Sequence, residues 1–497
     1  MPALNPIRLS CASLIGVVLV GGAIYFGATL KKPLSKLTAH VGIQEVLPDP
    51  AKIASSGDWY FLGNISNGLV DFDHTDGKFK PLLAEKWESF STGVHTFTLR
   101  EDAKFQDGTP ITSEDVIASI KRLLIKRTAT HFRLWEYIEG CENLKDLTQE
   151  CSGLHAVNHR MVEIRLKSPS ESFFLQLASP ETSIWSHQDI DEKTLELKPT
   201  KFSGPYSFTG FKDRAAILVR NEQNPISKAF PQSAREIHLV TYSLKEAEEA
   251  FKAGKLDVIF KGHNPYGESD WKALGFEVRA SSLSKLIYLH GASSSGSKNI
   301  GRDFVEALWK LNTDKELVAA KKFLPFAGDF SLSEAEFLRL LPEKSAKLVR
   351  IAVPYTYFSD GFLNLFVEAG KSVGIAVEIV RLERSEFFNS FEDRAAGERF
   401  DFILAPYAAS ERYPAVQLRY ITGSIRQAPI DLKKAETPDL TPEKIDVLKK
   451  YQAWLLESQH AIPAFFARVF FLYQKNIDIG EQPPSDAEIE LWRVTQK

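Results

Sequence analysis

Two histidines four residues apart, His155 and His159, could do chemistry, because on one face of a helix such a pair can hold a metal ion. The segment HAVNH, however, lies in a glycine-flanked loop that runs into a predicted strand. It also lacks the glutamate of the H-E-x-x-H motif and an obvious third ligand. We therefore expect surface or structural histidines here and no metal site.

Motifs for catalysis are missing from the sequence. It contains no G-x-S-x-G elbow, no phosphate-binding P-loop and no C-x-x-C pair. Lys255 follows Gly254, but without a glycine-rich loop this segment is simply the end of a helix. The sequence therefore predicts a protein that is not an enzyme and that needs no cofactor.

A loop of polar and aromatic residues, 405–414, is the better candidate for ligand chemistry. It follows the apolar segment 400–405, which predicts a buried strand, so the loop leaves the sheet where α/β proteins usually bind ligands. Tyr407 and Tyr413 could line a cleft or merely pack within the protein. Arg412 could pair with a ligand carboxylate or remain a solvated loop residue.

Composition limits the class of protein. The chain has 497 residues, of which 44% are hydrophobic, enough for two to four globular domains. Its net charge of −3, with both signs mixed, provides no basic surface for nucleic acid. We therefore expect no nucleic-acid partner.

The uncharged segment 13–30 is long enough to span a bilayer as a helix. Arg8 precedes it, as in a secretory signal, but no clear A-x-A cleavage site follows, which favours an uncleaved anchor over a removed signal. Cys11 lies before the apolar run, which argues against a lipoprotein. Three lysines beyond the span oppose the positive-inside rule: Lys31, Lys32 and Lys36.

The elements around residues 81–124 have strong local signals. Residues 94–100 alternate between polar and apolar types with a period of two, which predicts a half-buried strand with His95, Phe97 and Leu99 on one side. A turn at 107–110 follows. Thr112 or Ser113 then caps a helix whose apolar face is made of Val116, Ile117, Ile120, Leu123 and Leu124.

The wording of this stretch, LAEKWE followed by HTFTLREDAKFQDGTPITSEDVIASIKRLL, closely resembles the signature of family 5 bacterial extracellular solute-binding proteins. These are the oligopeptide, dipeptide and nickel receptors of ABC importers. Two shorter segments are also similar to the family pattern: 67–70, which ends in Gly-Leu-Val, and 203–206, where Ser203 stands in place of the usual Thr.

The resemblance implies an α/β, two-lobed periplasmic binding protein of type II, with an inserted α/β subdomain, preceded here by one N-terminal hydrophobic helix. We expect residues 1–39 to form the signal or anchor helix and tether, and 40–290 the first lobe, with the insertion at about 75–198. Residues 291–467 would form the second lobe, and 468–497 would return to the first. Alternating strands and helices predict a parallel crossover at 235–261 in the first lobe and a parallel α/β sheet at 348–405 in the second.

The family also implies which residues contact the ligand. In its peptide receptors the loop after the apolar strand reads aromatic, two small residues, Asp, and shortly afterwards Asp-Pro. The aromatic residue falls on Tyr407 and the proline on Pro414, but Ser410 and Tyr413 stand where the aspartates would be. The resulting set of expected ligand-binding residues is Asn67, Gly68, Tyr407, Ala409, Ser410, Glu411, Arg412 and Tyr413.

The missing carboxylates affect the kind of ligand, because a buried ammonium group needs a negative partner. Glu411 could supply one if the loop is shifted by one residue. Otherwise the ligand lacks a free amine, or is a sugar, a metal complex or a longer peptide held by backbone pairing.

Cys141 and Cys151 close a short loop, and outside the cytoplasm a disulfide between them is reasonable. Two unrelated buried thiols are the alternative.

From the resemblance we expect a periplasmic receptor, tethered to the inner membrane by residues 13–30, that delivers a peptide or related solute to an ABC permease. The alternative is a membrane-tethered sensor or scaffold that keeps the binding-protein fold without transport.

Overall fold

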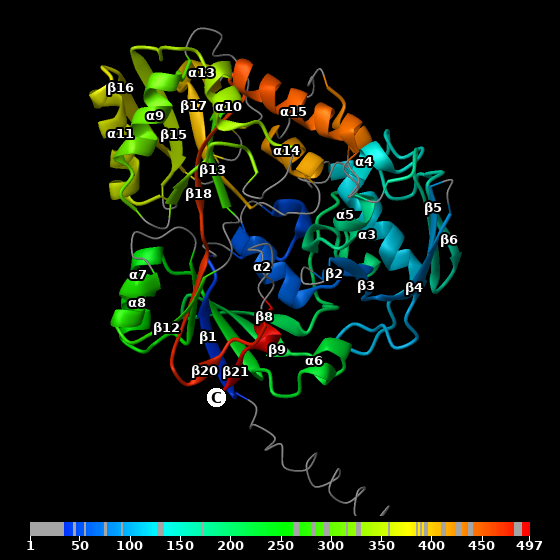
Figure 1. The fold of residues 1–497 in the computed structure, drawn as a ribbon. Helices are drawn as coiled ribbons and strands as arrows, with labels where there is room; N and C mark the ends of the chain where they lie inside the picture. Colours follow the sequence, from blue (N-terminus) through cyan, green and yellow to red (C-terminus); the bar gives the residue numbers. More distant parts are fainter. Residues whose placement is uncertain are drawn as a thin grey trace, which may run out of the picture.

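The computed structural model describes a mixed α/β chain built on two large sheets and one smaller one (Figure 1). The residues described are 34–42, 46–53, 56–73, 77–90, 93–126, 134–170, 172–261, 268–280, 285–292, 299–314, 317–324, 330–355, 358–383, 386–387, 390–391, 396–408, 414–422, 430–435, 441–481 and 490–497. The predicted membrane span at 13–30 lies outside them. Among the described helices, none is both long and apolar enough to cross a membrane.

The first large sheet has seven strands in the order β12-β19-β11-β1-β10-β9-β8. Its strands are β1 (Lys36–His40), β8 (Tyr206–Lys212), β9 (Ala215–Arg220), β10 (Glu236–Val240), β11 (Val258–Lys261), β12 (Glu277–Ala280) and β19 (Phe470–Tyr473). The predicted strand–helix–strand crossover is confirmed, because β10 and β11 both run parallel to β1, which lies between them.

The helix of this crossover, α7 (Leu244–Lys252), begins and ends where its sequence predicts. Ser243 and Glu246 form a reciprocal capping box at its start. Gly254 adopts a φ of +71° just beyond its end, a conformation that favours glycine.

The second large sheet has six strands in the order β14-β18-β13-β17-β15-β16. Its strands are β13 (Lys285–Gly291), β14 (Leu317–Ala319), β15 (Leu348–Pro354), β16 (Ala376–Leu382), β17 (Phe402–Ala408) and β18 (Ala461–Ala467). The predicted parallel unit is present, because β15 pairs in parallel with both β16 and β17, and α11 (Asp360–Ser372) connects β15 to β16.

Both large sheets are nevertheless mixed, because antiparallel strands lie beside the predicted parallel units. In the second sheet β13 runs antiparallel to β17 and β18. The reason is topological: β13 brings the chain from the first sheet and β18 leads it back to β19, so the two must point in opposite directions.

The smaller sheet, of order β4-β5-β7-β6, belongs to the segment predicted as an insertion. Its strands are β4 (Ala84–Ser89), β5 (Val94–Leu99), β6 (Leu154–Asn158) and β7 (Met161–Arg165). His95, Phe97 and Leu99 are the buried face of β5, as the alternation predicted. Helix α3 (Ser113–Lys126) follows with Val116, Ile120, Leu123 and Leu124 buried.

The remaining elements cover these sheets or connect them (Figure 1). They include α2 (Ser56–Ile65), α4 (Leu134–Tyr137), α5 (Ser172–Leu177), α6 (Pro225–Ala229), α8 (Glu268–Ala273), α9 (Arg302–Leu311), α10 (Glu334–Leu340), α13 (Ala396–Arg399), α14 (Pro414–Thr422), α15 (Pro442–Glu457), β2 (Val70–Asp73), β3 (Lys78–Pro81), β20 (Ile477–Asp478) and β21 (Thr495–Gln496). Separate hydrophobic cores lie under the first sheet, under the second sheet and inside the insertion.

Candidate functional site

Ser203, in the motif that resembles the family pattern, is the centre of a buried polar network. Its Oγ accepts a hydrogen bond from the backbone N–H of Asn67 at 2.9 Å and donates to the carbonyl of Ile184 at 3.3 Å. Its own carbonyl accepts from the side-chain amides of Asn67 and Asn224, at 3.1 and 2.8 Å. The network ties the end of α2 to the segment that leads into β8.

Asn67 and Gly68, which were predicted to contact ligand, have structural roles in this buried network, which we call the frame. The Asn67 side chain is buried and its amide already donates to Ser203. A Cβ at position 68 would lie 2.7 Å from the carbonyl oxygen of Leu177, so only glycine fits there. The structure therefore gives both residues a structural role, and their contact with ligand stays a prediction.

The other predicted ligand residues follow β17. Tyr407 lies on that strand opposite Leu286 of β13, and it packs half-buried against the core of the second sheet. Ala409, Ser410, Glu411, Arg412 and Tyr413 lie outside the described residues. Strand β17 extends to Ala408, beyond the strand end predicted at 405, and the chain is described again from Pro414, where α14 begins.

Helix α14 carries a polar side chain that the sequence did not single out. Ala415, Leu418 and Ile421 anchor the helix in the second core. Gln417 is only 2% exposed, yet neither atom of its amide group forms a hydrogen bond with any described residue. Leaving a buried amide unpaired costs free energy, so Gln417 is a candidate for contact with a ligand.

Arg419 of the same helix reaches the insertion. Its guanidinium donates a hydrogen bond to the hydroxyl of Tyr137 on α4, with an N–O distance of 2.5 Å. The guanidinium carbon also lies 5.3 Å from the centre of the Tyr137 ring. Arg419 and Tyr137, which are 282 positions apart in the sequence, thus connect the helix packed on the second sheet to the insertion. No local sequence signal marks either residue.

His290, near the C-terminal end of β13, is a buried titratable group close to Ile421 of α14. Burial, with the nearby His460 as a smaller cause, lowers the pKa of His290 to about 4. Its Nδ1 forms no hydrogen bond within the described part of the chain. The ring is therefore neutral at neutral pH and can act only as a hydrogen-bonding group.

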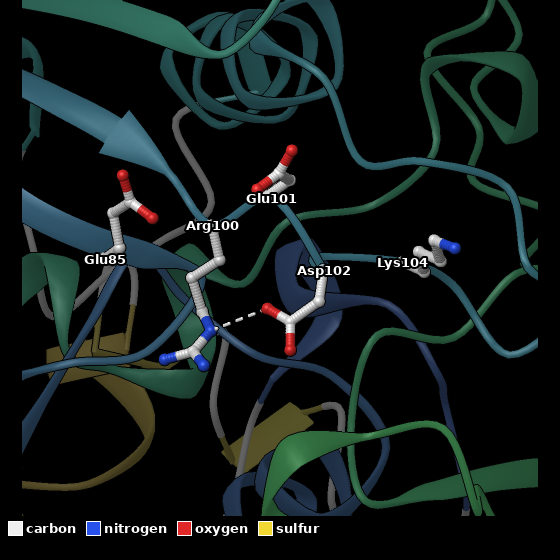
Figure 2. Close-up of a pocket in the computed structure, with 5 residues that line it drawn as sticks. All are labelled: Glu85, Arg100, Glu101, Asp102 and Lys104. Carbon is white, nitrogen blue, oxygen red and sulfur yellow. Dashed lines mark hydrogen bonds and ion pairs between the residues drawn. The ribbon is translucent and has the colours of Figure 1, made fainter.

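Two hollows on the surface do not resemble a ligand site. One, of about 400 Å³, is lined by Glu85, Arg100, Glu101, Asp102 and Lys104. Figure 2 shows that two of its charged side chains pair with each other, since Arg100 Nε donates to Asp102 at 3.0 Å. The other, of about 480 Å³, lies between α11 and β16, on the outer edge of the second sheet.

The histidines with metal-like spacing are not on a helix. His155 lies on the exposed strand β6 and its Nε2 is 2.7 Å from the carbonyl oxygen of Ser152, while His159 occupies the following turn. Among the residues that the structure describes, no three His, Cys, Asp or Glu side chains gather in a way that could hold a metal ion.

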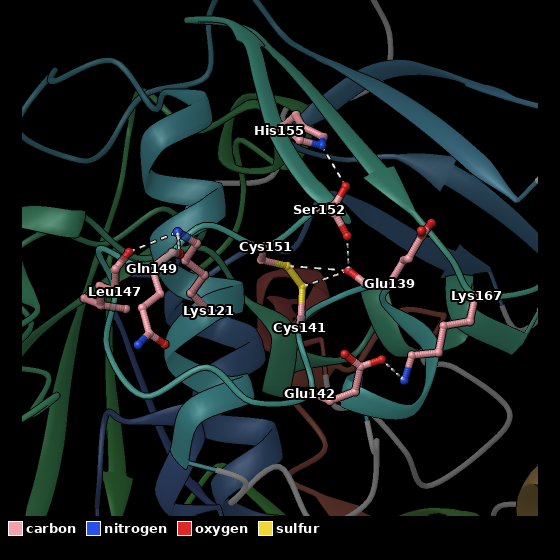
Figure 3. Close-up of a disulfide and its surroundings, with 10 residues drawn as sticks. All are labelled: Lys121, Glu139, Cys141, Glu142, Leu147, Gln149, Cys151, Ser152, His155 and Lys167. Atoms are coloured by element: carbon pink, nitrogen blue, oxygen red, sulfur yellow. Dashed lines mark hydrogen bonds and ion pairs between the residues drawn. A yellow bond between two sulfur atoms is a disulfide. The ribbon is translucent and has the colours of Figure 1, made fainter.

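Cys141 and Cys151 are joined by a disulfide, with their Cα atoms 5.0 Å apart (Figure 3). The loop between them is also fastened to α3. The ammonium group of Lys121 donates to the carbonyls of Leu147 and Gln149, at 3.0 and 2.6 Å. The loop is thus fixed at both its ends and its middle, directly after the helix α4 that carries Tyr137.

Comparisons with known proteins agree with the expected family. Residues 78–290 match the family described as bacterial extracellular solute-binding proteins, family 5 Middle. The periplasmic oligopeptide-binding protein OppA of Escherichia coli (strain K12) is 30% identical over 182 residues, 35% of this chain and 32% of OppA. The periplasmic murein peptide-binding protein MppA of the same organism is 28% identical over 172 residues, 33% of this chain and 32% of MppA.

These alignments cover about a third of each relative's length, whereas solved structures match nearly the whole chain. The oligopeptide-binding protein OppAIV of Borrelia burgdorferi superimposes with a TM-score of 0.76 at 19% identity, over 93% of this chain and 100% of that one. NikA from Brucella suis, in complex with Fe(III)-EDTA, gives 0.72 at 17% identity, with coverage of 93% and 100%. The mixed α/β fold matches that of two-lobed periplasmic peptide-binding proteins, and residues 78–290 are similar to family 5 of the bacterial extracellular solute-binding proteins.

Proposed function

We propose that this protein is an extracytoplasmic receptor that captures a peptide or a related small solute between its two lobes and presents it to an ABC permease. The match of residues 78–290 to family 5 is the observation that carries the proposal. The arrangement of the sheets supports it, since they have separate cores and are connected through β12–β13 and β18–β19. Such halves can close around a ligand by bending at the connections.

We place the ligand between the insertion and the region where β17 leads into α14. Tyr407, Ala409, Ser410, Glu411, Arg412 and Tyr413 would contact it there, as the family's loop implies. Serine and tyrosine at 410 and 413 deprive an α-ammonium group of the expected carboxylates. We therefore propose a ligand held chiefly through its backbone or other neutral polar groups.

This proposal has a direct test. Native mass spectrometry of protein purified without refolding should reveal a retained peptide or solute. Isothermal titration calorimetry with the same peptide in its free and N-acetylated forms should then give similar affinities, because positions 410 and 413 carry no carboxylate to pair with the amine. If acetylation weakens binding strongly and Glu411→Gln abolishes that preference, Glu411 supplies the missing charge. Failure of every peptide and solute to bind would contradict the receptor proposal.

We also propose that residues 13–30 tether the protein to the inner membrane, with the folded part in the periplasm. The uncharged span and the lack of a cleavage motif support this. The tethered protein should remain in the membrane fraction after a carbonate wash and should be digested by protease added to spheroplasts. Release of a shortened chain into the periplasm would mean instead that the segment is a removed signal.

A further inference from the structure

We propose that Arg419 and Tyr137 form a clasp that holds the two lobes together before any ligand binds. This inference concerns how the proposed receptor is regulated, and it rests on that function only for its effect on affinity. The two residues come from different structural bodies. Tyr137, only 6% exposed, belongs to the core of the insertion, whereas α14 is anchored by Ala415, Leu418 and Ile421 in the core of the second sheet.

The contact is specific in geometry as well as in position. A guanidinium nitrogen donates to the Tyr137 hydroxyl at 2.5 Å, and the guanidinium group also lies over the ring at 5.3 Å from its centre. A charged donor strengthens the hydrogen bond, and the face of the ring attracts the cation. Lysine would keep the charge but lose the planar fork that serves both contacts.

Tyr137 is held in place by contacts within the insertion. The backbone around Tyr137 pairs with the end of β7: the Tyr137 carbonyl accepts from Lys167 at 2.9 Å, and Glu139 N–H donates to Arg165 at 3.0 Å. The loop that follows is closed by the disulfide and fastened to Lys121 (Figure 3). A fixed tyrosine and a helix-borne arginine lose little freedom when they meet, so the clasp favours closure.

The clasp also lies away from the connection between the sheets. In Figure 1, α14 and α4 meet on the side facing the insertion, while β18 descends to the first sheet on the other side. A contact far from the hinge opposes opening, because even a small rotation at the hinge separates its two partners widely. Breaking the contact should therefore raise the population of open molecules. Since apparent affinity scales with the competent fraction, ligand binding should weaken in proportion.

Distance distributions between spin labels on the full chain test the clasp. The labels are placed at two exposed positions, through Lys86→Cys on β4 and Glu443→Cys on α15, in a Cys11→Ser background that leaves the disulfide intact. Without ligand, Arg419→Met should shift the distribution to longer distances. Tyr137→Phe, which removes only the hydroxyl, and Arg419→Lys should each give a smaller shift.

Arg214→Met is the matched control. Arg214 lies over the Tyr242 ring at 5.0 Å and pairs with Glu246, but all three residues belong to the first sheet and its crossover. This change should leave the distribution unchanged. Identical distributions for Arg419→Met and Arg214→Met, in proteins with native circular dichroism, would overturn the clasp.

Binding data separate this inference from the proposed function. With a peptide that binds the wild type, Arg419→Met should raise Kd about tenfold, and saturating peptide should restore the short distances. If a peptide binds but neither Kd nor the distances change, the receptor proposal stands and the clasp fails. If nothing binds but the ligand-free distances shift, the clasp stands and the receptor proposal loses its support.

Discussion

The buried polar groups around Ser203 are hydrogen-bonded to one another, whereas a buried amide on α14 pairs with no described residue. The hydroxyl and carbonyl of Ser203 and the amides of Asn67 and Asn224 pair with one another. On α14, by contrast, the Gln417 amide is equally buried but pairs with no described residue. The first arrangement is a rigid frame. The second leaves the Gln417 amide without a hydrogen-bonding partner among the described residues.

The charged groups of the two regions also differ: one arginine is paired with a buried carboxylate, and the other contacts a tyrosine of the insertion. Outside this network, Arg122 of α3 and Asp49 form a buried bidentate pair, with N–O distances of 2.8 and 2.7 Å. At α14, the cation of Arg419 is used across the gap between two cores, on Tyr137. The comparison teaches that Asn67 and Ser203, in segments resembling the family pattern, have structural roles, while the residues that we propose to respond to ligand lie on α14, outside those segments.

The largest effect is expected from breaking the buried ion pair between Arg122 and Asp49. Arg122→Met leaves the Asp49 carboxylate buried without its partner, which should lower the free energy of unfolding by about 3–5 kcal/mol. Urea denaturation followed by circular dichroism measures this. Lys371→Met, which removes the exposed partner of Glu368, is the control and should cost less than about 1 kcal/mol. Equal losses would show that the buried pair is not special.

A smaller, pH-dependent effect is expected near α14. The folded-state pKa of His290, about 4, lies below the unfolded value of 6.5, so the unfolded chain binds more protons between these values. Stability is therefore fully present at neutral pH and falls as the pH drops from about 6.5 toward 4, by about 3 kcal/mol from this group.

His290→Leu should remove that part of the acid sensitivity, as seen in denaturation curves at pH 7 and pH 4.5. His95 and His460, whose pKa values are also lowered by burial, remain in the variant as an internal reference. An unchanged difference between the two pH values would mean that His290 is already protonated or accessible in the folded protein.

Removing the Ser203 hydroxyl should cost less again. Ser203→Ala leaves the Asn67 N–H without its acceptor in a buried position, which corresponds to about 1–3 kcal/mol. The substitution Ser207→Ala, on the half-buried part of β8, serves as a control. A loss no greater than that of the control would weaken the view of Ser203 as a structural centre.

The smallest effect, and the one of opposite sign, is expected at Gln417. Gln417→Met replaces a buried amide that pairs with no described residue by an apolar side chain of similar length, so stability should stay equal or rise by up to about 1 kcal/mol. Binding of a retained ligand should weaken at the same time. If stability falls and binding is unchanged, the amide belongs to the frame after all.

The sequence by itself determined the elements whose causes are local. The alternation at 94–99 predicted which face of β5 is buried, and Ser243 and Gly254 marked the ends of α7. The signature phrase also predicted the family. These features follow from backbone periodicity, capping and turn chemistry, which act over a few residues.

Only the tertiary structure decided which residues meet over long distances. It made the sheets mixed, assigned Asn67 and Gly68 to the frame, buried Gln417 where no described residue pairs with its amide, and brought Arg419 to Tyr137. A glutamine or an arginine on a helix has the same local pattern whether it faces solvent, a core or another lobe. Its role is fixed by the packing of segments hundreds of residues apart, which no local pattern encodes.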